Sequence, residues 1–336
     1  MRLVTYRTAS SDERVGLLLD GNVLDVRGAA EQESSQAPPW SRSMLDFLRA
    51  GPTARRELEQ LVTAREGNGA FMHREAEVEL LAPVPRPESV RDAMSFERHV
   101  LQVTRVAALG RLARLDMLAE KQLGARRTLA AALNREFYVQ PPYYRSNHRS
   151  ISGPGAEVRI PTGCRKFDYE LEWGVFIAVQ GRDIPASRAA EHIGGYTIFN
   201  DFSARDIQRA EMRSRLGPAK SKNFDTGNAM GPCLATPDEL PDPYNLTMTA
   251  RINGEEWSRG NTGEAYWRFE QLIEHISRDE TIYPGDFIGS GTCSGVLGMG
   301  CGLEQGRFLS PGDVVELEVQ GIGVLHNRVA GNGKGG

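Results

Sequence analysis

The run FDYELEWGVFI (residues 167–177) decides the fold, because its polar and apolar residues alternate as they do in a β-strand. Side chains alternate between two faces along a strand, so Glu170 and Glu172 are expected on one face, about 6–7 Å apart. The apolar residues between and after them then face the other side. Two carboxylates this close favour a cation between them. Alternating glutamates are also common on a solvated sheet face, so both interpretations stay open at this point.

A third carboxylate ends the next apolar run, YTIFND (residues 196–201). Asp201 stands at the end of this expected strand and precedes a polar segment, so it is placed to complete a cluster with Glu170 and Glu172. Three oxygen donors without Cys or His suit a hard ion such as Mg²⁺, Mn²⁺ or Ca²⁺ rather than zinc.

The chain after residue 150 is dominated by strand patterns bounded by Gly or Pro. Such runs occur at residues 158–160, 170–179, 196–199, 246–252, 287–288 and 314–319. Helical segments at 186–193 and 266–277 do not alternate regularly with them, which disfavours a doubly wound parallel sheet. We therefore predict an α+β, β-rich fold built around a mixed β-roll or barrel.

The first 82 residues form a separate pattern of short strands and two short helices. Asp20-Gly21 is a hairpin turn signal between two of these strands. Three prolines within residues 82–87 block regular structure and mark a boundary. We predict a small N-terminal α+β domain (1–82), a larger domain (83–330) and a flexible tail (331–336).

Residues 100–136 are rich in Leu, Ala and Arg and contain no proline. Their apolar residues recur at helical spacing: Val106, Leu109, Leu112, Leu115 and Leu118. This pattern predicts a helical insertion that packs through its leucines, with a lid over a pocket as the alternative.

Composition excludes several classes of function. The 336 residues carry 40 Lys+Arg against 44 Asp+Glu, so no basic excess is present for nucleic acid. No apolar stretch approaches the length needed to span a bilayer, and the first residues lack the apolar core of a signal peptide. The four cysteines include no C-x-x-C pair. We expect a cytoplasmic protein with no nucleic-acid or membrane partner.

Together these motifs resemble the fumarylacetoacetate hydrolase family over roughly residues 83–330. The resemblance rests on D-Y-E-x-E at 168–172, N-D-x-S-A-R-D-x-Q at 200–208, Lys222 and Ser290-Gly291-Thr292. It implies a β-rich roll or barrel, a smaller N-terminal domain and a homodimer.

The resemblance also implies the metal ligands, which would be Glu170, Glu172 and Asp201, with Asp92 as a fourth carboxylate. Mg²⁺ is the expected ion, and Mn²⁺ and Ca²⁺ remain possible. His99 follows Asp92 by seven residues, which is the spacing of the catalytic histidine in fumarylacetoacetate hydrolase. His99 is therefore the predicted general base.

Further residues match positions that bind substrate or assist catalysis in the family. Lys222, Arg205 and Gln208 are predicted to act in catalysis, the last two also as substrate ligands. Tyr144 and Thr292 are predicted to contact substrate. Salt bridging or capping for Arg205 and Gln208, aromatic packing for Tyr144 and a plain turn at 289–292 are the alternatives.

One position departs from the family. Smaller members carry a glutamate that orients the histidine, where this chain has Gln102. An amide can hydrogen-bond an imidazole, but it cannot stabilise imidazolium as a carboxylate does. Glu304 is the candidate replacement, by analogy with a glutamate beyond the S-G-T loop in fumarylacetoacetate hydrolase.

The predicted activity is metal-dependent hydrolysis of a C–C bond in a 1,3-dicarbonyl or acylpyruvate-like acid. The substrate would be a small carboxylate or diketone. A decarboxylase or keto–enol isomerase on the same scaffold is the alternative, for which Gln102 is the best support. A non-catalytic ligand-binding homologue is a third interpretation.

Overall fold

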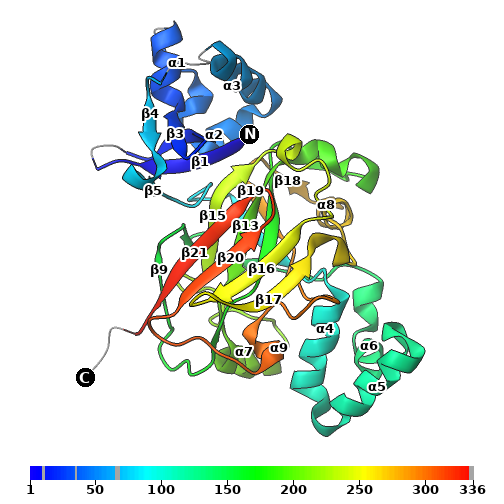
Figure 1. Ribbon diagram of the computed structural model, residues 1–336. Helices are drawn as coiled ribbons and strands as arrows, with labels where there is room; N and C mark the ends of the chain where they lie inside the picture. The colour runs from blue at the N-terminus through cyan, green and yellow to red at the C-terminus, as the bar shows by residue number, and fades with distance from the viewer. Residues whose placement is uncertain (10–11, 35, 65–68, 333–336) are drawn as a thin grey trace.

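The computed structural model describes residues 1–9, 12–34, 36–64 and 69–332. Most of the predicted tail, residues 333–336, lies outside this range. Within it the strands form two main open sheets and no closed barrel, with helices at the periphery (Figure 1). The predicted β-rich α+β fold is confirmed.

The larger sheet runs through the whole molecule. Its order is β4 (Met72–Arg74), β3 (Asn22–Asp25), β2 (Arg14–Leu19), β1 (Arg2–Arg7), β15 (Asn228–Ala235), β13 (Ile193–Asp201), β11 (Glu172–Ile177), β19 (Asp286–Gly289), β6 (Ser89–Ala93) and β7 (Tyr143–Ser146). Two short strands join it off this path: β5 (Glu79–Leu80) pairs with β1, and β8 (Ile151–Ser152) pairs with β15. Most neighbours are antiparallel, whereas β6 runs parallel to β19.

The smaller sheet packs across one face of the larger one. Its order is β17 (Glu255–Asn261), β16 (Thr247–Ile252), β20 (Val314–Val319), β21 (Gly323–Ala330) and β9 (Glu157–Arg159). Two further pairs stand apart: β10 (Phe167–Asp168) with β14 (Ser203–Ala204), and β12 (Gly181–Arg182) with β18 (Thr281–Ile282).

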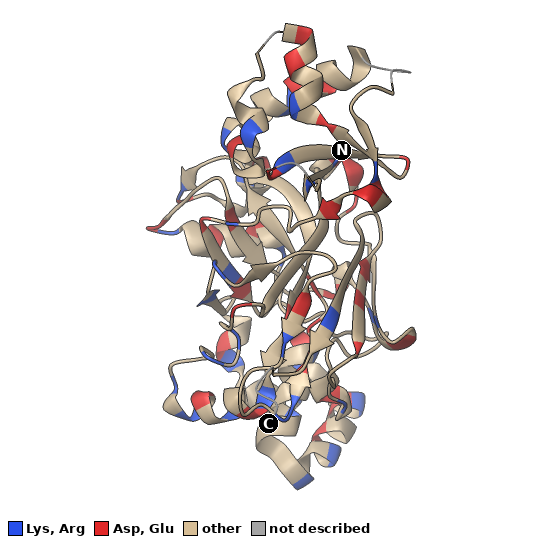
Figure 2. Ribbon diagram, turned by 90° about the vertical axis from the view of Figure 1, so that its left-hand side faces the viewer, with Lys and Arg blue, Asp and Glu red and all other residues tan. Residues whose placement is uncertain are grey.

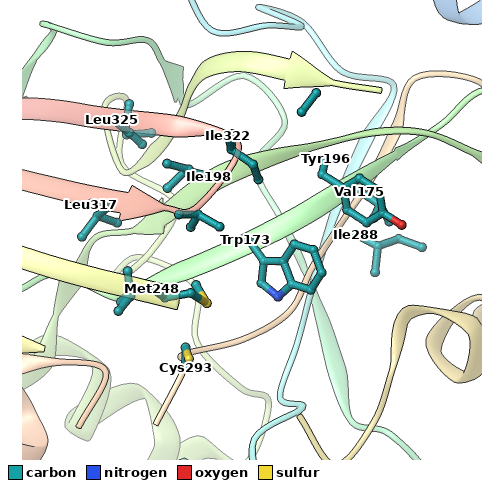
Figure 3. Close-up of a cluster of buried hydrophobic side chains, with 14 of the residues drawn as sticks. Trp173, Val175, Tyr196, Ile198, Met248, Ile288, Cys293, Leu317, Ile322 and Leu325 are labelled. Atoms are coloured by element: carbon teal, nitrogen blue, oxygen red, sulfur yellow. The ribbon is translucent and has the colours of Figure 1, made fainter. Parts of the chain in front are cut away.

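The main hydrophobic core lies between the two sheets, and Figure 3 shows its centre. Trp173 on β11 is 1% exposed and stacks on Tyr196 of β13, with ring centroids 5.3 Å apart. Leu317 and Leu325 reach the same cluster from the smaller sheet. The alternation of residues 172–177 thus buries Trp173 and Val175 in this core and turns Glu172 to the other face.

The N-terminal segment is continuous with the larger sheet, because β1 pairs with β15. The predicted hairpin at Asp20-Gly21 joins β2 to β3, with φ of 46° and 75° as such turns require. Helices α1 (Val26–Ser34), α2 (Met44–Ala50) and α3 (Pro52–Ala64) form a second core with the far face of the sheet.

The predicted helical insertion contains α4 (Glu97–Thr104), a π-helical turn (Arg105–Leu109), α5 (Ala113–Leu123) and α6 (Leu129–Leu133). The remaining helices are α7 (Arg205–Glu211), α8 (Phe269–Ser277) and α9 (Gly302–Gln305). Figure 1 shows α4–α6 projecting from the body of the molecule. Residues 186–192 form a 3₁₀ helix.

The insertion does not pack through its leucines as predicted. Of the five regularly spaced apolar residues only Leu109 is buried, and Leu115 is 63% exposed. Helix α5 instead turns an acidic residue inward: Asp116 is 5% exposed. Its carboxylate lies 2.8 Å from Nε of buried Arg105 and accepts N–H groups from Leu129 and Ala130. An ion pair and two backbone donors therefore set the orientation of this helix.

Replacing Asp116 by Ala should destabilise the insertion by about 1–3 kcal/mol, because Nε of Arg105 and the N–H groups of Leu129 and Ala130 lose their acceptor, while Glu120 still pairs with Nη1 of Arg105. Leu115→Ala, one residue away, should change stability by less than about 0.5 kcal/mol, because that side chain is exposed. Hydrogen exchange of the α4–α6 amides measures both. Equal losses of protection in the two variants would contradict this account.

Candidate active site

Three strands of the larger sheet each contribute one carboxylate to the same face. Asp92 lies on β6, Glu172 on β11 and Asp201 at the end of β13. Glu172 is opposite Phe199, two residues before Asp201, so both acids share that face. Strand β19 lies between β11 and β6, and its Gly289 is opposite Asp92. Strand register thus assembles the cluster.

Glu170 joins the cluster from outside the strand in which it was predicted. Strand β11 begins at Glu172, and Glu170 forms an isolated bridge to Cys301 instead. Its N–H donates to the side-chain oxygen of Asn200 at 3.0 Å. Oxygens of Asp92, Glu170 and Glu172 all lie within 4.8 Å of one another, and the three residues are buried.

Asp201 is the fourth acid, and it is held by two other residues. Lys222 Nζ lies 2.5 Å from Asp201 Oδ2 and 2.6 Å from Glu170 Oε2, so it bridges the two carboxylates. The Tyr144 hydroxyl donates to Asp201 Oδ2 as well. Among the described residues, Asp201 Oδ1 and Glu172 Oε2 have no hydrogen-bond partner although both are buried.

Burial and mutual repulsion perturb these acids strongly. Burial, reinforced by the charge of Asp201, raises the pKa of Asp92 to about 8. Burial and Asp92 raise the pKa of Glu172 well above its ordinary value. Burial also raises the pKa of Asp201 to about 6, although Lys222 opposes the shift. Glu170 differs: burial disfavours its charge, but Lys222 and Arg205 hold its pKa well below the usual range.

These residues fit a hard divalent cation. The donors are all carboxylate oxygens, which suit Mg²⁺, Mn²⁺ or Ca²⁺. Two of the oxygens are buried without partners, and such atoms cost free energy unless a ligand satisfies them. A cation would also relieve the repulsion that raises the pKa of Asp92 and Glu172.

His99 lies beside this cluster in contact with a carboxylate distant in sequence. On α4, its Nδ1 is 3.1 Å from Glu304 Oε1 on α9. Glu304 Oε2 accepts hydrogen bonds from Ser294 Oγ at 2.7 Å and the Gly300 N–H at 2.9 Å. Although burial disfavours its charge, His99 and these donors lower the pKa of Glu304. Within the described chain Gln102 is buried but makes no hydrogen bond to His99.

Cys301, whose sulfur lies within 4.8 Å of the ligand atoms of His99 and Glu304, forms the backbone bridge to Glu170. The imidazole and the carboxylate cluster therefore belong to one site.

The guanidinium of Arg205 forms ion pairs with two carboxylates. Its Nε lies 2.7 Å from Asp168 and its Nη2 lies 2.8 Å from Glu170. Its Nη1 donates to Gln208 Oε1 at 3.1 Å, so the predicted proximity of Arg205 and Gln208 on one helical turn holds. Thr292 Oγ1 lies 3.4 Å from Glu172 Oε1.

Two groups were missed by sequence reasoning. Asp168 is fully buried, binds Arg205 and accepts the N–H groups of Gly302 and Leu303 at the start of α9. Its place at the start of the D-Y-E-x-E motif was the available signal. Ser294 anchors Glu304, but its position beyond the S-G-T loop gave no local sequence signal.

Comparisons with known proteins identify the family of the chain. The family model described as the C-terminal domain of fumarylacetoacetate hydrolase matches residues 120–330. A mitochondrial oxaloacetate tautomerase of Xenopus laevis is 30% identical over 335 residues, which cover 98% of this chain and 90% of the relative. The chain belongs to the fumarylacetoacetate hydrolase family.

Solved structures of this family share the fold. The maleylpyruvate hydrolase from Sphingobium sp. SYK-6, solved with manganese(II) and pyruvate, superposes with a TM-score of 0.70 at 19% identity. It aligns over 99% of this chain and all of its own. The 5-carboxymethyl-2-hydroxymuconate delta-isomerase from Mycobacterium smegmatis aligns over the same shares, with a TM-score of 0.67 and 23% identity. Proteins similar to this chain thus include a hydrolase, an isomerase and a tautomerase.

Figure 2 shows Lys and Arg interspersed with Asp and Glu along the molecule. Among the described residues, no helix has both the length and the apolar character needed to cross a membrane.

Gly289 has no side chain, and this leaves room for the carboxylate of Asp92. A Cβ added there would lie 2.4 Å from Asp92 Oδ1 and 3.2 Å from Phe199. Gly289→Ala should therefore displace Asp92 and weaken Mn²⁺ binding by about tenfold or more in calorimetric titration. Gly69→Ala is the matched control, because among the described residues no atom beyond its chain neighbours lies within 4 Å of its added Cβ. A folded Gly289→Ala variant with unchanged Mn²⁺ affinity would refute this role.

Stability of the metal-free protein should fall as pH rises towards 8. The pKa of Asp92 is raised from 3.8 to about 8, so the native state holds a proton that the unfolded chain has released. The stability from this proton is complete below pH 3.8 and is lost as pH passes about 8. Excess Mn²⁺ should consequently raise the melting temperature more at about pH 8.5 than at about pH 6.

Differential scanning fluorimetry with and without Mn²⁺ measures this difference. Asp92→Asn should reduce the difference in Mn²⁺ stabilisation between the two pH values, because the titrating carboxyl is gone. Equal stabilisation by Mn²⁺ at both pH values in the wild type would count against the prediction.

Proposed function

We propose that the protein is a divalent-metal-dependent hydrolase that cleaves a C–C bond in a 1,3-dicarbonyl or acylpyruvate-like acid. The observation that carries the proposal is the buried pair of His99 and Glu304 beside a cluster of four carboxylates. Hydrolysis needs a base that deprotonates water next to a polarised carbonyl. This pair supplies the base, and the carboxylates supply the cation site.

Asp92, Glu170, Glu172 and Asp201 would hold the cation, for which we propose Mg²⁺. When bound, the cation supplies Lewis acidity that polarises a substrate carbonyl and stabilises negative charge on its oxygen. The maleylpyruvate hydrolase solved with manganese(II) and pyruvate supports a divalent ion with an oxo-acid ligand in this fold.

His99 accepts the proton of the attacking water and returns it to the leaving carbon. Glu304 orients the ring through Nδ1 and stabilises the imidazolium that forms. The lowered pKa of Glu304 keeps it ionised for this role. Gln102 in place of the family's glutamate favours decarboxylation or isomerisation, which need no activated water. The contact of His99 with Glu304 supports water activation instead.

Lys222 and Arg205 keep positive charge inside the site. Asp201 and Glu170 raise the pKa of Lys222, although burial opposes its charge, so the ammonium is retained. We propose that Lys222, Arg205 and Gln208 stabilise the charge that develops on substrate oxygens. Tyr144 and Thr292, which contact Asp201 and Glu172, would bind the substrate next to the cation.

For the domains, the oligomeric state and the location, we propose what the sequence predicts. We propose a small N-terminal domain (1–82), a catalytic domain (83–330) with the α4–α6 insertion, a homodimer and a cytoplasmic location. His99 lies on α4, where this insertion begins, and we propose that the insertion shapes access to the site.

Keto–enol tautomerisation of a 2-oxo diacid is the second candidate. It is favoured by the Xenopus laevis oxaloacetate tautomerase, which is similar over nearly the whole chain. The same base and cation would serve, with His99 taking the proton from carbon rather than from water.

A substrate panel separates the two reactions. With acylpyruvates and Mg²⁺, we expect loss of enol absorbance with two acid products in equal amounts. His99→Ala and Glu304→Gln should lower kcat about 10²–10⁴-fold, because each removes part of the base. His326→Ala is the control, since His326 is an exposed residue on β21.

Conversion of enol-oxaloacetate without any acid cleavage product would overturn the hydrolase in favour of the tautomerase. Full activity of the His99→Ala variant would refute both mechanisms.

A further inference from the structure

A second group of metal-ligating side chains adjoins the carboxylate cluster. His99 on α4, Cys301 just before α9 and Glu304 on α9 are all buried. One nitrogen, one sulfur and one oxygen from these residues lie within 4.8 Å of one another. The backbone of Cys301 bridges to Glu170, so the two groups share a boundary.

The donor types of the two clusters differ. The first offers only carboxylate oxygens, which suit hard ions, whereas the second offers a thiol and an imidazole beside one carboxylate. Sulfur and nitrogen donors select zinc over magnesium. Three protein ligands with a fourth position left for water is also the ligand count of many accessible zinc sites.

The Cys301 thiol is available as a ligand. It is a free cysteine with no exposed surface, and within the described residues it makes no hydrogen bond. Cys293 and Cys233, equally buried, donate to the carbonyls of Asn261 and Ile322. Cys301 therefore is an unpartnered buried polar group that faces a histidine and a carboxylate.

Glu304 and the surrounding charges favour a cation here. Ser294 and the Gly300 N–H fix Glu304 Oε2, which leaves Oε1 directed at His99. Burial and the charges of Glu304, Asp168 and Glu170 raise the pKa of the Cys301 thiol, and Arg205 opposes this shift. The same acids would attract a bound cation, and coordination would deprotonate the thiol.

We propose that His99, Cys301 and Glu304 form a zinc site whose occupation withdraws His99 from acid–base chemistry. Coordination replaces the S–H bond of Cys301 by an S–Zn bond and releases one proton. Zinc is then an inhibitor of an enzyme that works with a harder ion in the adjoining carboxylate cluster. The inhibition rests on the proposed hydrolase function, whereas the binding does not.

Cobalt(II) can replace zinc, and its visible absorption bands depend on the ligands that coordinate it. The full-length protein is first saturated with Mg²⁺ to fill the carboxylate cluster, and Co²⁺ is then titrated. We expect a sulfur-to-cobalt charge-transfer band and tetrahedral visible bands at one equivalent. Cys301→Ala should abolish the charge-transfer band. Cys293→Ala is the matched control and should keep it, because that buried thiol lies outside the cluster.

Inhibition is measured on the same proteins with Zn²⁺ against constant Mg²⁺. Cys301→Ala should need at least about tenfold more Zn²⁺ for half inhibition, while Cys293→Ala should match the wild type. Absence of the band in the wild type, or its persistence in Cys301→Ala, overturns the zinc site. If the band appears but Zn²⁺ does not inhibit, the claim that bound zinc withdraws His99 from catalysis is wrong. A protein inactive on every substrate would defeat the proposed function, and the spectrum would still decide the site.

Discussion

The burial of four carboxylates on one side of a sheet is the constraint on which the rest of the site depends. Negative charges brought together in a low-dielectric interior repel each other and lose their hydration. Lys222 and Arg205 offset part of this cost by direct ion pairs with Glu170. Within the described part of the chain Asp92 and Glu172 form no ion pair, and their pKa values are raised instead. The fold therefore keeps a region of unbalanced negative charge that a divalent cation can satisfy.

The strand residues of this region could be predicted because local patterns determine them. Glu172 and Asp201 each stand in a run whose alternation fixes which side they face, and the register of β11 and β13 then aligns them. Asp92 and His99 were placed by family spacing rather than by pattern. The contact of His99 with Glu304 joins residues 205 positions apart, and no local signal specifies such a distance. The family resemblance suggested Glu304 as a candidate, and the fold brings it into contact with His99.

The orientation of α5 shows where pattern reading fails. Apolar spacing predicts that a helix is amphipathic, but it does not say which side has a partner. Here the buried guanidinium of Arg105 selects the acidic side, and the leucines face outward. Similarly, Glu170 fits a strand pattern but is drawn out of the strand by Asn200 and the bridge to Cys301. Tertiary partners overrode local preference in both places.

The pairing of β1 with β15 has a consequence for the integrity of the catalytic sheet. Strand β15 lies next to β13, which carries Asp201, and β1 pairs with the end of its other side at Leu234 and Ala235. Without the N-terminal segment, the backbone N–H and C=O groups of β15 that pair with β1 would become an open edge. Open edges recruit strands from other molecules. The N-terminal segment thus covers part of a strand edge with which other molecules could otherwise pair.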